Sequence, residues 1–226
     1  MILHAEKLTK EYEQGEKRIR AVQNATFSIE EGEFVAIVGT SGSGKSTLLS
    51  MIGGLERPTS GEVLLDGENL YAASDNRLSE IRNRQIGFVF QNYGLLPVLT
   101  LRENIMIPQL IAGGGSKSYM EELFDLLGLR NRLDHLPSEA SGGQQQRAAV
   151  ARALVNQPKI LLADEPTGNL DKQSAADLIG LLLKTREKLG QTILLVTHDP
   201  DIAAKADRVL RMDGGVLAEG ERRQTL

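Results

Sequence analysis

The sequence feature that most constrains the fold is a glycine-rich loop close to residue 40. Residues 39–47 match the pattern G-x-x-x-x-G-K-[ST] at every defined position. The loop follows a strand-type run that ends at Val38, and a helix-type segment begins near Ser46. This setting lets backbone N–H groups and the positive end of a helix point at phosphate oxygens together. The predicted phosphate-binding residues are Gly39, Thr40, Ser41, Gly42, Ser43, Gly44, Lys45, Ser46 and Thr47.

Two side chains of this loop are expected to have separate roles. Lys45 is expected to bridge the β- and γ-phosphates of a nucleotide, and the Ser46 hydroxyl is expected to bind Mg²⁺. The loop alone does not distinguish kinases, GTPases and ATPases. The guanine-specifying pattern N-K-x-D is absent from the sequence, and the segments that follow decide the class.

Two adjacent carboxylates end an apolar run later in the chain. Asp164 and Glu165 follow Ile160–Ala163 directly. A parallel strand is buried on both faces and places reactive groups at its carboxyl end, beside the phosphate loop. We expect Asp164 to hold Mg²⁺ and Glu165 to polarise the attacking water. Pro166 bends the chain as it leaves the strand, which allows both side chains to reach one site.

Single polar residues end two further strand-type runs. Gln91 follows Ile86–Phe90, and His198 comes just after Thr192–Thr197. Taken alone, each residue fits a structural or solvated role as well as a functional one. If their strands neighbour the acidic strand, Gln91 would serve as a neutral ligand of Mg²⁺ or water. His198 would donate a hydrogen bond to the γ-phosphate.

The order of strand-type and helix-type segments predicts an α/β fold. The two types alternate in the first and last parts of the chain, which indicates a largely parallel sheet with helices on its faces. The strand signal disappears in the middle. We predict a core of residues 1–91 and 157–226, which includes an antiparallel β subdomain, and a helical subdomain of residues 92–156.

Composition and hydropathy exclude two kinds of direct partner. The 26 basic and 30 acidic residues give a net charge of −4, so there is no global positive field for nucleic acid. No apolar run approaches the ~20 residues that span a bilayer. We therefore expect no nucleic-acid partner and no direct membrane insertion; a role at a membrane would need a partner that supplies the spanning part.

A second helix start in the chain has the features of an anion-binding site. Ser141 is followed by two glycines and then by Gln144, which resembles a capping box. Each glycine costs a helix about 1 kcal/mol relative to alanine. A helix that begins with two glycines exposes bare backbone N–H groups, and such groups suit a nearby anion.

Together these segments resemble the ABC ATPase family along nearly the whole chain. Residues 141–144 are similar to its signature motif, 39–47 to Walker A and 160–165 to Walker B. Gln91 resembles its Q-loop, residues 169–171 its D-loop and His198 its H-loop. Tyr12 stands where the family's adenine-stacking aromatic residue belongs.

This resemblance implies a P-loop NTPase of the ABC ATPase fold that binds ATP and Mg²⁺ and hydrolyses ATP. It also implies a head-to-tail homodimer with two ATPs between the chains. The signature residues Ser141, Gly143 and Gln144 of one subunit would then face the nucleotide held by the other subunit. Asp171 joins the predicted nucleotide-binding residues through the D-loop.

Closer resemblance is to the MacB/LolD/FtsE-like branch of this family. It rests on Gly53–Gly61, Arg82–Arg84, Leu95–Pro97 and Gly168–Asp171, while Ala140 departs from the leucine usual before the signature serine. The branch implies a separate transmembrane permease, energised for export, lipoprotein release or peptide handling. It implies a cytoplasmic location, peripheral on the inner face of the cell membrane. The alternative is an FtsE-like role in cell division.

An apolar stretch directly after Gln91 has two interpretations. Residues 93–99 contain a tyrosine, three leucines, a proline and a valine. They fit the core of the helical subdomain, and they equally fit a groove for a helix of the membrane partner, as in the family. Both interpretations can hold for different residues of the stretch.

Overall fold

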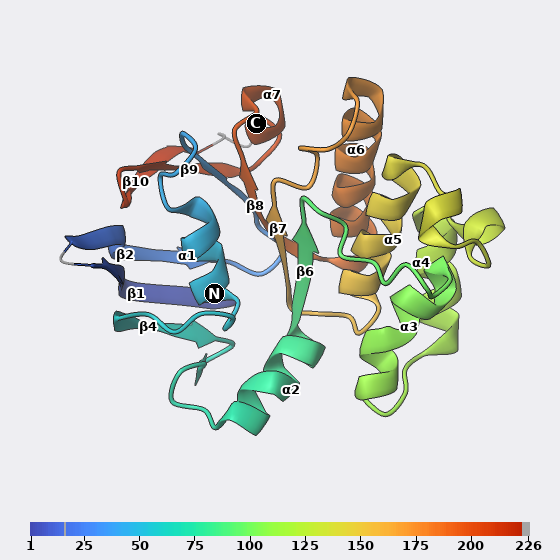
Figure 1. Ribbon diagram of the computed structural model, residues 1–226, viewed down its shortest axis with the longest axis horizontal. Helices are drawn as coiled ribbons and strands as arrows, with labels where there is room; N and C mark the ends of the chain where they lie inside the picture. Colours follow the sequence, from blue (N-terminus) through green and yellow to red (C-terminus); the bar gives the residue numbers. More distant parts are fainter. Residues whose placement is uncertain (16, 223–226) are drawn as a thin grey trace. The chain divides into compact units, whose positions relative to one another are not determined.

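The computed structural model describes residues 1–15 and 17–222, which form two compact units (Figure 1). The first unit combines Met1–Ser79 with the chain from Thr192 onward, and the second contains Glu80–Gln191. The helix α2 (Asp75–Gln85) includes the boundary between them. Among the described residues, no helix is long and apolar enough to cross a membrane.

The first unit contains an antiparallel group of strands and a parallel group. Its strand order is β5-β4-β1-β2-β10-β9-β3-β8. The antiparallel group confirms the predicted β subdomain: β1 pairs with both β2 and β4. The strands are β1 (Leu3–Gln14), β2 (Lys17–Ile29), β3 (Phe34–Val38), β4 (Ser60–Leu65), β5 (Glu68–Asn69), β8 (Thr192–Thr197), β9 (Arg208–Asp213) and β10 (Val216–Arg222).

The parallel group of the first unit is centred on β3. This strand pairs in parallel with β8 on one side and with β9 on the other. All six residues of β8 are buried, as the continuous apolar run predicts for a strand covered on both faces. The helix α1 (Lys45–Ile52) follows β3 after the glycine-rich loop, and the short α7 (Pro200–Ala203) follows β8.

The second unit pairs two parallel strands and surrounds them with helices. The strands β6 (Ile86–Phe90) and β7 (Ile160–Asp164) are in register, with Phe90 opposite Asp164. A Cβ atom on Gly87 would lie 2.5 Å from the Ala153 carbonyl oxygen, so a helix approaches β6 at its glycine. The helices are α3 (Leu101–Ile111), α4 (Lys117–Leu126), α5 (Gly142–Leu154), α6 (Lys172–Leu189) and two 3₁₀ turns, Arg130–Arg132 and Pro137–Glu139.

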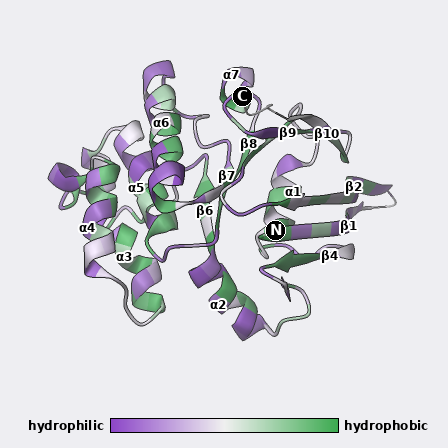
Figure 2. Ribbon diagram, turned by 180° about the vertical axis from the view of Figure 1, so that it is seen from behind, coloured by the Kyte–Doolittle hydropathy of each residue, from purple (hydrophilic) through white to green (hydrophobic). Residues whose placement is uncertain are grey.

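The helix α6 of the second unit buries one side and leaves the other largely polar. The helix α6 carries both hydrophobic and hydrophilic residues (Figure 2) and buries Leu178, Ile179 and Leu182 while it packs against α4 and α5. Asp171 caps its first turn, and Gly190 ends it in the left-handed conformation. These two residues therefore set the ends of α6.

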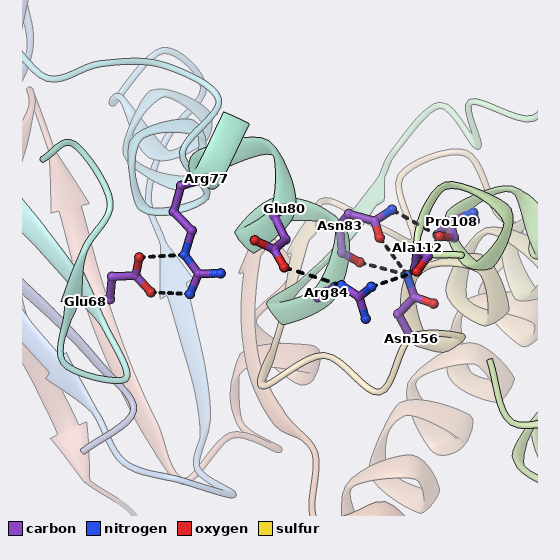
Figure 3. A network of polar contacts seen from close by, with 8 residues as sticks. All are labelled: Glu68, Arg77, Glu80, Asn83, Arg84, Pro108, Ala112 and Asn156. Atoms are coloured by element: carbon purple, nitrogen blue, oxygen red, sulfur yellow. Dashed lines mark hydrogen bonds and ion pairs between the residues drawn. The ribbon is translucent and has the colours of Figure 1, made fainter. Parts of the chain in front are cut away.

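Polar contacts anchor each end of α2 within its own unit (Figure 3). In the first unit, the Arg77 guanidinium donates two hydrogen bonds to the Glu68 carboxylate, at 2.8 and 2.7 Å. These bonds hold the pKa of Glu68 below its usual value. In the second unit, Asn83 donates to the Pro108 carbonyl oxygen, and Arg84 donates to that of Ala112. Both ends of the helix are therefore tied down by side chains.

Candidate functional site

The glycine-rich loop lies where the sequence predicts it, between the end of β3 and the start of α1. Gly42 and Gly44 have positive φ angles of 76° and 101°. A Cβ atom on Gly44 would also collide with the Ala21 carbonyl oxygen. Only glycine fits this position, because it combines a left-handed backbone with close packing. The loop therefore curls so that the first N–H groups of α1 are exposed for an anion.

Lys45 folds back across this loop. Its side chain is buried, and Nζ donates to the carbonyl oxygens of Gly39 at 2.9 Å and Thr40 at 2.8 Å. A buried ammonium group whose hydrogen-bond partners are neutral carbonyls attracts an anion strongly. The Ser43 hydroxyl is also buried, and it has no hydrogen-bond partner among the described residues. An unsatisfied buried hydroxyl and a buried cation in one loop fit the phosphates of a nucleotide.

Tyr12 lies on β1 in the same unit as the loop. Tyr12 is 38% exposed, and its hydroxyl donates to the Glu56 carboxylate at 2.7 Å. Lys10 Nζ lies 5.2 Å from the ring centroid. Burial and the Glu56 carboxylate raise the pKa of Tyr12, and a hydrogen bond with Thr47 acts against them. Tyr12 therefore lies in the same unit as the phosphate loop and is partly exposed.

His198 and the start of the loop line one cavity in the first unit. The cavity has a volume of about 810 Å³, and Gly39, Thr40 and His198 contribute to its wall together with residues of α7 and β9. Asp199, next to His198, caps α7 by accepting from the backbone N–H groups of residues 201 and 202. The structure thus brings the predicted H-loop histidine and the predicted Walker A segment to a common space.

Asp164 and Glu165 end β7 in the second unit. Because Phe90 lies opposite Asp164, Gln91 and Glu165 leave two neighbouring strands at the same level. Glu165 has a φ angle of 44°, in the left-handed region that non-glycine residues rarely occupy. Such a conformation costs about 1–3 kcal/mol and persists only where the surroundings hold it. The backbone at the predicted catalytic carboxylate is therefore strained.

Gln91 contacts the predicted D-loop. Asn169 Nδ2 donates to the Gln91 carbonyl oxygen at 3.0 Å, and Gln91 Nε2 lies 3.4 Å from Asn169 Oδ1. A Cβ atom on Gly168 would lie 2.6 Å from Gln91 Nε2. The sequence places Asn169 in a motif but does not indicate this contact, which joins residues 78 positions apart.

The predicted signature segment forms the N-terminus of α5 as expected. Ser141 Oγ accepts from the Gln144 backbone N–H at 3.3 Å, and Gln144 Oε1 accepts from the Ser141 N–H at 3.0 Å. A Cβ atom on Gly143 would lie 3.4 Å from Ser174 Oγ. Asp171 accepts from the Ser174 N–H and hydroxyl, and these hydrogen bonds hold the pKa of Asp171 below its usual value. The signature and D-loop segments therefore adjoin within the second unit.

The predicted site residues are divided between the two units. The first unit brings together the phosphate loop, Tyr12 and His198, and the second brings together Gln91, the signature segment and the acidic pair. No group of three or more His, Asp or Glu side chains among the described residues is arranged to hold a metal ion. Mg²⁺ in nucleotide sites needs only one or two carboxylates plus phosphate oxygens, so a larger acidic cluster is not required for it.

Comparisons with known proteins agree along the full chain. The ABC transporter family model matches residues 22–168. An uncharacterized ABC transporter ATP-binding protein of Thermotoga maritima is 46% identical over 94% of this chain and 92% of its own length. The lipoprotein-releasing system ATP-binding protein LolD of Shewanella denitrificans is 45% identical over 95% and 93%. The macrolide export ATP-binding/permease protein MacB of Rhodopirellula baltica is 43% identical, and this chain spans 32% of its length.

A solved structure of an ATP-binding cassette is also similar to this chain. The dimeric, post-hydrolysis structure of the ATP-binding cassette MJ0796 bound to ADP and Pi has a TM-score of 0.90 to this chain. It is 40% identical in sequence and covers 100% of both chains. The predicted fold class is confirmed by this match. The chain belongs to the ABC transporter family, as an ATP-binding protein that hydrolyses ATP.

Proposed function

We propose that this chain works as a homodimer around two Mg-ATP molecules and drives a separate membrane permease of the lipoprotein-release or export type. The observation that carries the proposal is the presence of two anion-binding helix starts on one chain. One is the phosphate loop before α1, and the other is the capped, glycine-rich start of α5. A single nucleotide needs one phosphate loop, so the second helix start serves a nucleotide held by another subunit.

Each predicted site residue has a side chain or backbone suited to one step of ATP binding or hydrolysis. Lys45 would neutralise the β- and γ-phosphates, and Ser46 and Asp164 would hold Mg²⁺ with Gln91. Mg²⁺ supplies charge neutralisation between the β- and γ-phosphates. Glu165 would orient the attacking water, and His198 would donate to the γ-phosphate. Tyr12 would stack on adenine. Ser141, Gly143 and Gln144 would contact the γ-phosphate of the partner's nucleotide.

Exposed apolar residues after Gln91 support a membrane partner. Leu96 is 48% exposed and Val98 is 81% exposed, so neither belongs to the core. Tyr93, Leu95 and Leu99 are half-buried. Asn104 holds this loop by accepting from the Leu96 N–H and donating to its carbonyl oxygen, at 2.7 and 3.0 Å. The loop is therefore held in a shape that presents apolar side chains, which suits an apolar helix of a partner.

The similar proteins whose names state an activity indicate which kind of permease this chain would drive. Lipoprotein-releasing system proteins match over nearly their full length, and the macrolide export protein named above carries an ATP-binding part of this kind. Lipoprotein release and export are therefore the activities that the comparisons favour for the partner. Co-purification of this chain with a cell-division membrane protein would instead support the FtsE-like alternative.

A trapped dimer tests the core of the proposal. Glu165→Gln keeps the size of the side chain but removes the carboxylate that orients water, so ATP should bind and remain. We expect the variant to elute as a dimer in size-exclusion chromatography with Mg-ATP and as a monomer with Mg-ADP. Glu139→Gln, on the 3₁₀ turn before α5, is the matched control and should hydrolyse ATP like the wild type. A Glu165→Gln variant that binds ATP but remains monomeric would rule out the sandwich.

A further inference from the structure

Gln146 is a buried glutamine of α5 that has no part in the roles proposed above. Its side chain has no exposed surface. Its Nε2 donates to the Pro166 carbonyl oxygen at 2.7 Å and to the Phe90 carbonyl oxygen at 3.2 Å. Its Oε1 is buried and has no hydrogen-bond partner among the described residues. An unsatisfied buried oxygen is unfavourable, so the two N–H contacts must offset it.

The two carbonyls that Gln146 contacts flank the proposed catalytic segments. Phe90 immediately precedes Gln91, and Pro166 immediately follows Glu165. These residues leave β6 and β7 at the level where the two strands end. Pro166 has no backbone N–H and cannot extend the strand ladder. The side-chain amide of Gln146 therefore supplies hydrogen-bond donors at the point where the paired backbones separate.

Glu165 has a strained backbone directly beside one of these two carbonyls. The backbone of Glu165 is left-handed, with φ at 44°, and two hydrogen bonds lie on its C-terminal side. The Gly168 N–H donates to the Glu165 carbonyl oxygen at 3.0 Å, and Gln146 donates to that of Pro166. Gln91 has separate support, because Asn169 donates to its carbonyl oxygen at 3.0 Å. The contact of Gln146 with the Pro166 carbonyl is also the shorter of its two, so loss of the amide should affect the Glu165 segment more than the Gln91 segment.

We propose that Gln146 is a positioning residue for ATP hydrolysis, which keeps the Glu165 carboxylate in place by holding the Pro166 carbonyl. The proposal rests on the role of Glu165 given above. Gln144 and Gln146 lie two residues apart on α5 and point to different sides of it. The helix that presents the signature segment to the partner's nucleotide therefore also holds, on another side, the carboxylate of its own subunit. A shift of α5 would move Glu165.

Gln146→Met tests the positioning role, because methionine keeps the length of the side chain and cannot donate. We expect kcat for ATP to fall by roughly tenfold or more while the Kd for ATP stays within about twofold of the wild type. Gln145→Met is the matched control, since Gln145 donates to the Ala140 carbonyl oxygen and not to the Phe90 or Pro166 carbonyl, and its kcat should stay within about twofold. Both are assayed at a temperature where circular dichroism shows each variant fully folded. An unchanged kcat in folded Gln146→Met would overturn the proposal.

A double-mutant cycle separates positioning from a general structural effect. If Gln146 acts through Glu165, substitution of Gln146 should have little further effect on hydrolysis in a variant that already lacks the Glu165 carboxylate. We expect single-turnover hydrolysis by Glu165→Gln/Gln146→Met to lie within about twofold of Glu165→Gln alone. A further fall as large as the one that Gln146→Met causes in the wild type would overturn the proposal. A wrong role for Glu165 would give a different result from a wrong role for Gln146, because Glu165→Gln alone would then leave hydrolysis unchanged.

Discussion

Ser141 and Gln144 hold each other at the start of α5 through two reciprocal hydrogen bonds, each from the backbone N–H of one to the side chain of the other. This arrangement satisfies two backbone donors without the aid of a ligand. Neither of these two hydrogen bonds uses the N–H group of Gly142 or of Gly143. Those glycine N–H groups are the ones available to an anion.

Removal of this cap should separate nucleotide binding from turnover. Ser141→Ala loses the cap, at a cost of about 1 kcal/mol in unfolding free energy, and loses a proposed contact with the partner's nucleotide. We expect ATP turnover to fall at least about tenfold while ATP binding to the isolated chain is unchanged. Ser116→Ala is the matched control, because Ser116 caps α4 through the Tyr119 N–H and takes no part in the site. Equal turnover of the two variants would contradict the proposed role.

Lys45 should be required for nucleotide binding itself. Lys45→Ala removes the buried ammonium group, and with it the charge that faces the phosphates. We expect the Kd for a fluorescent ATP analogue to rise at least about tenfold, which corresponds to about 1.4 kcal/mol. Lys7→Ala removes an exposed lysine of the same unit and should bind as the wild type does. Tight binding by Lys45→Ala would show that the loop holds phosphate through its backbone alone.

Tyr12 should act through its ring and not through its hydroxyl. Tyr12→Phe loses the hydrogen bond to Glu56, which contributes about 1 kcal/mol to stability, and keeps the surface for stacking. Tyr12→Ala loses both. We therefore expect ATP affinity to stay within about twofold in Tyr12→Phe and to weaken about fivefold or more in Tyr12→Ala. Equilibrium measurements of ATP binding by both variants check this prediction. If the two variants bind ATP with equal affinity, the Tyr12 ring does not contact the nucleotide.

Leu96 should couple the ATPase to its membrane partner. Leu96→Asp places a charge in the exposed apolar loop, and basal ATP hydrolysis by the free chain should stay within about twofold because the side chain lies outside the core. Retention of the membrane partner in detergent pull-down should be lost. Ile19→Asp introduces the same charge at a position of the first unit that is 47% exposed, and it should leave the pull-down intact. If both variants retain the partner, the loop is not the docking site.

The partly buried hydroxyl of Tyr119 should make the folded protein less stable in alkali. Its hydroxyl donates to the Leu154 carbonyl oxygen at 3.1 Å, and burial raises its pKa to about 12. Between the unfolded pKa of about 10 and this value, only the folded state keeps the proton, so stability falls as pH rises. We expect the difference in Tm between the wild type and Tyr119→Phe to shrink between pH 10 and pH 11.5. A constant difference would show that Tyr119 contributes no pH dependence.

Motifs with short-range requirements could be predicted from the sequence. The phosphate loop, the capped start of α5 and the strand before Asp164 depend on residues within a few positions of each other. The helix α3 could also have been found, because Thr100 and Glu103 form a capping box that the sequence displays. Its interior Pro108 weakens the helical pattern, which explains why the sequence indicated only a region without strands.

The sequence by itself determined which local structures are suited to bind phosphate, because hydrogen bonds between residues three or four apart follow from spacing and side-chain chemistry. Only the tertiary structure decided what holds the catalytic segments. Gln146 reaches carbonyls 56 and 20 residues away, and Asn169 reaches Gln91 across 78 residues. It also decided that Leu96 and Val98 are exposed. Such contacts depend on how helices pack on strands, and a polar residue inside a helix gives no sign of the backbone that it will meet.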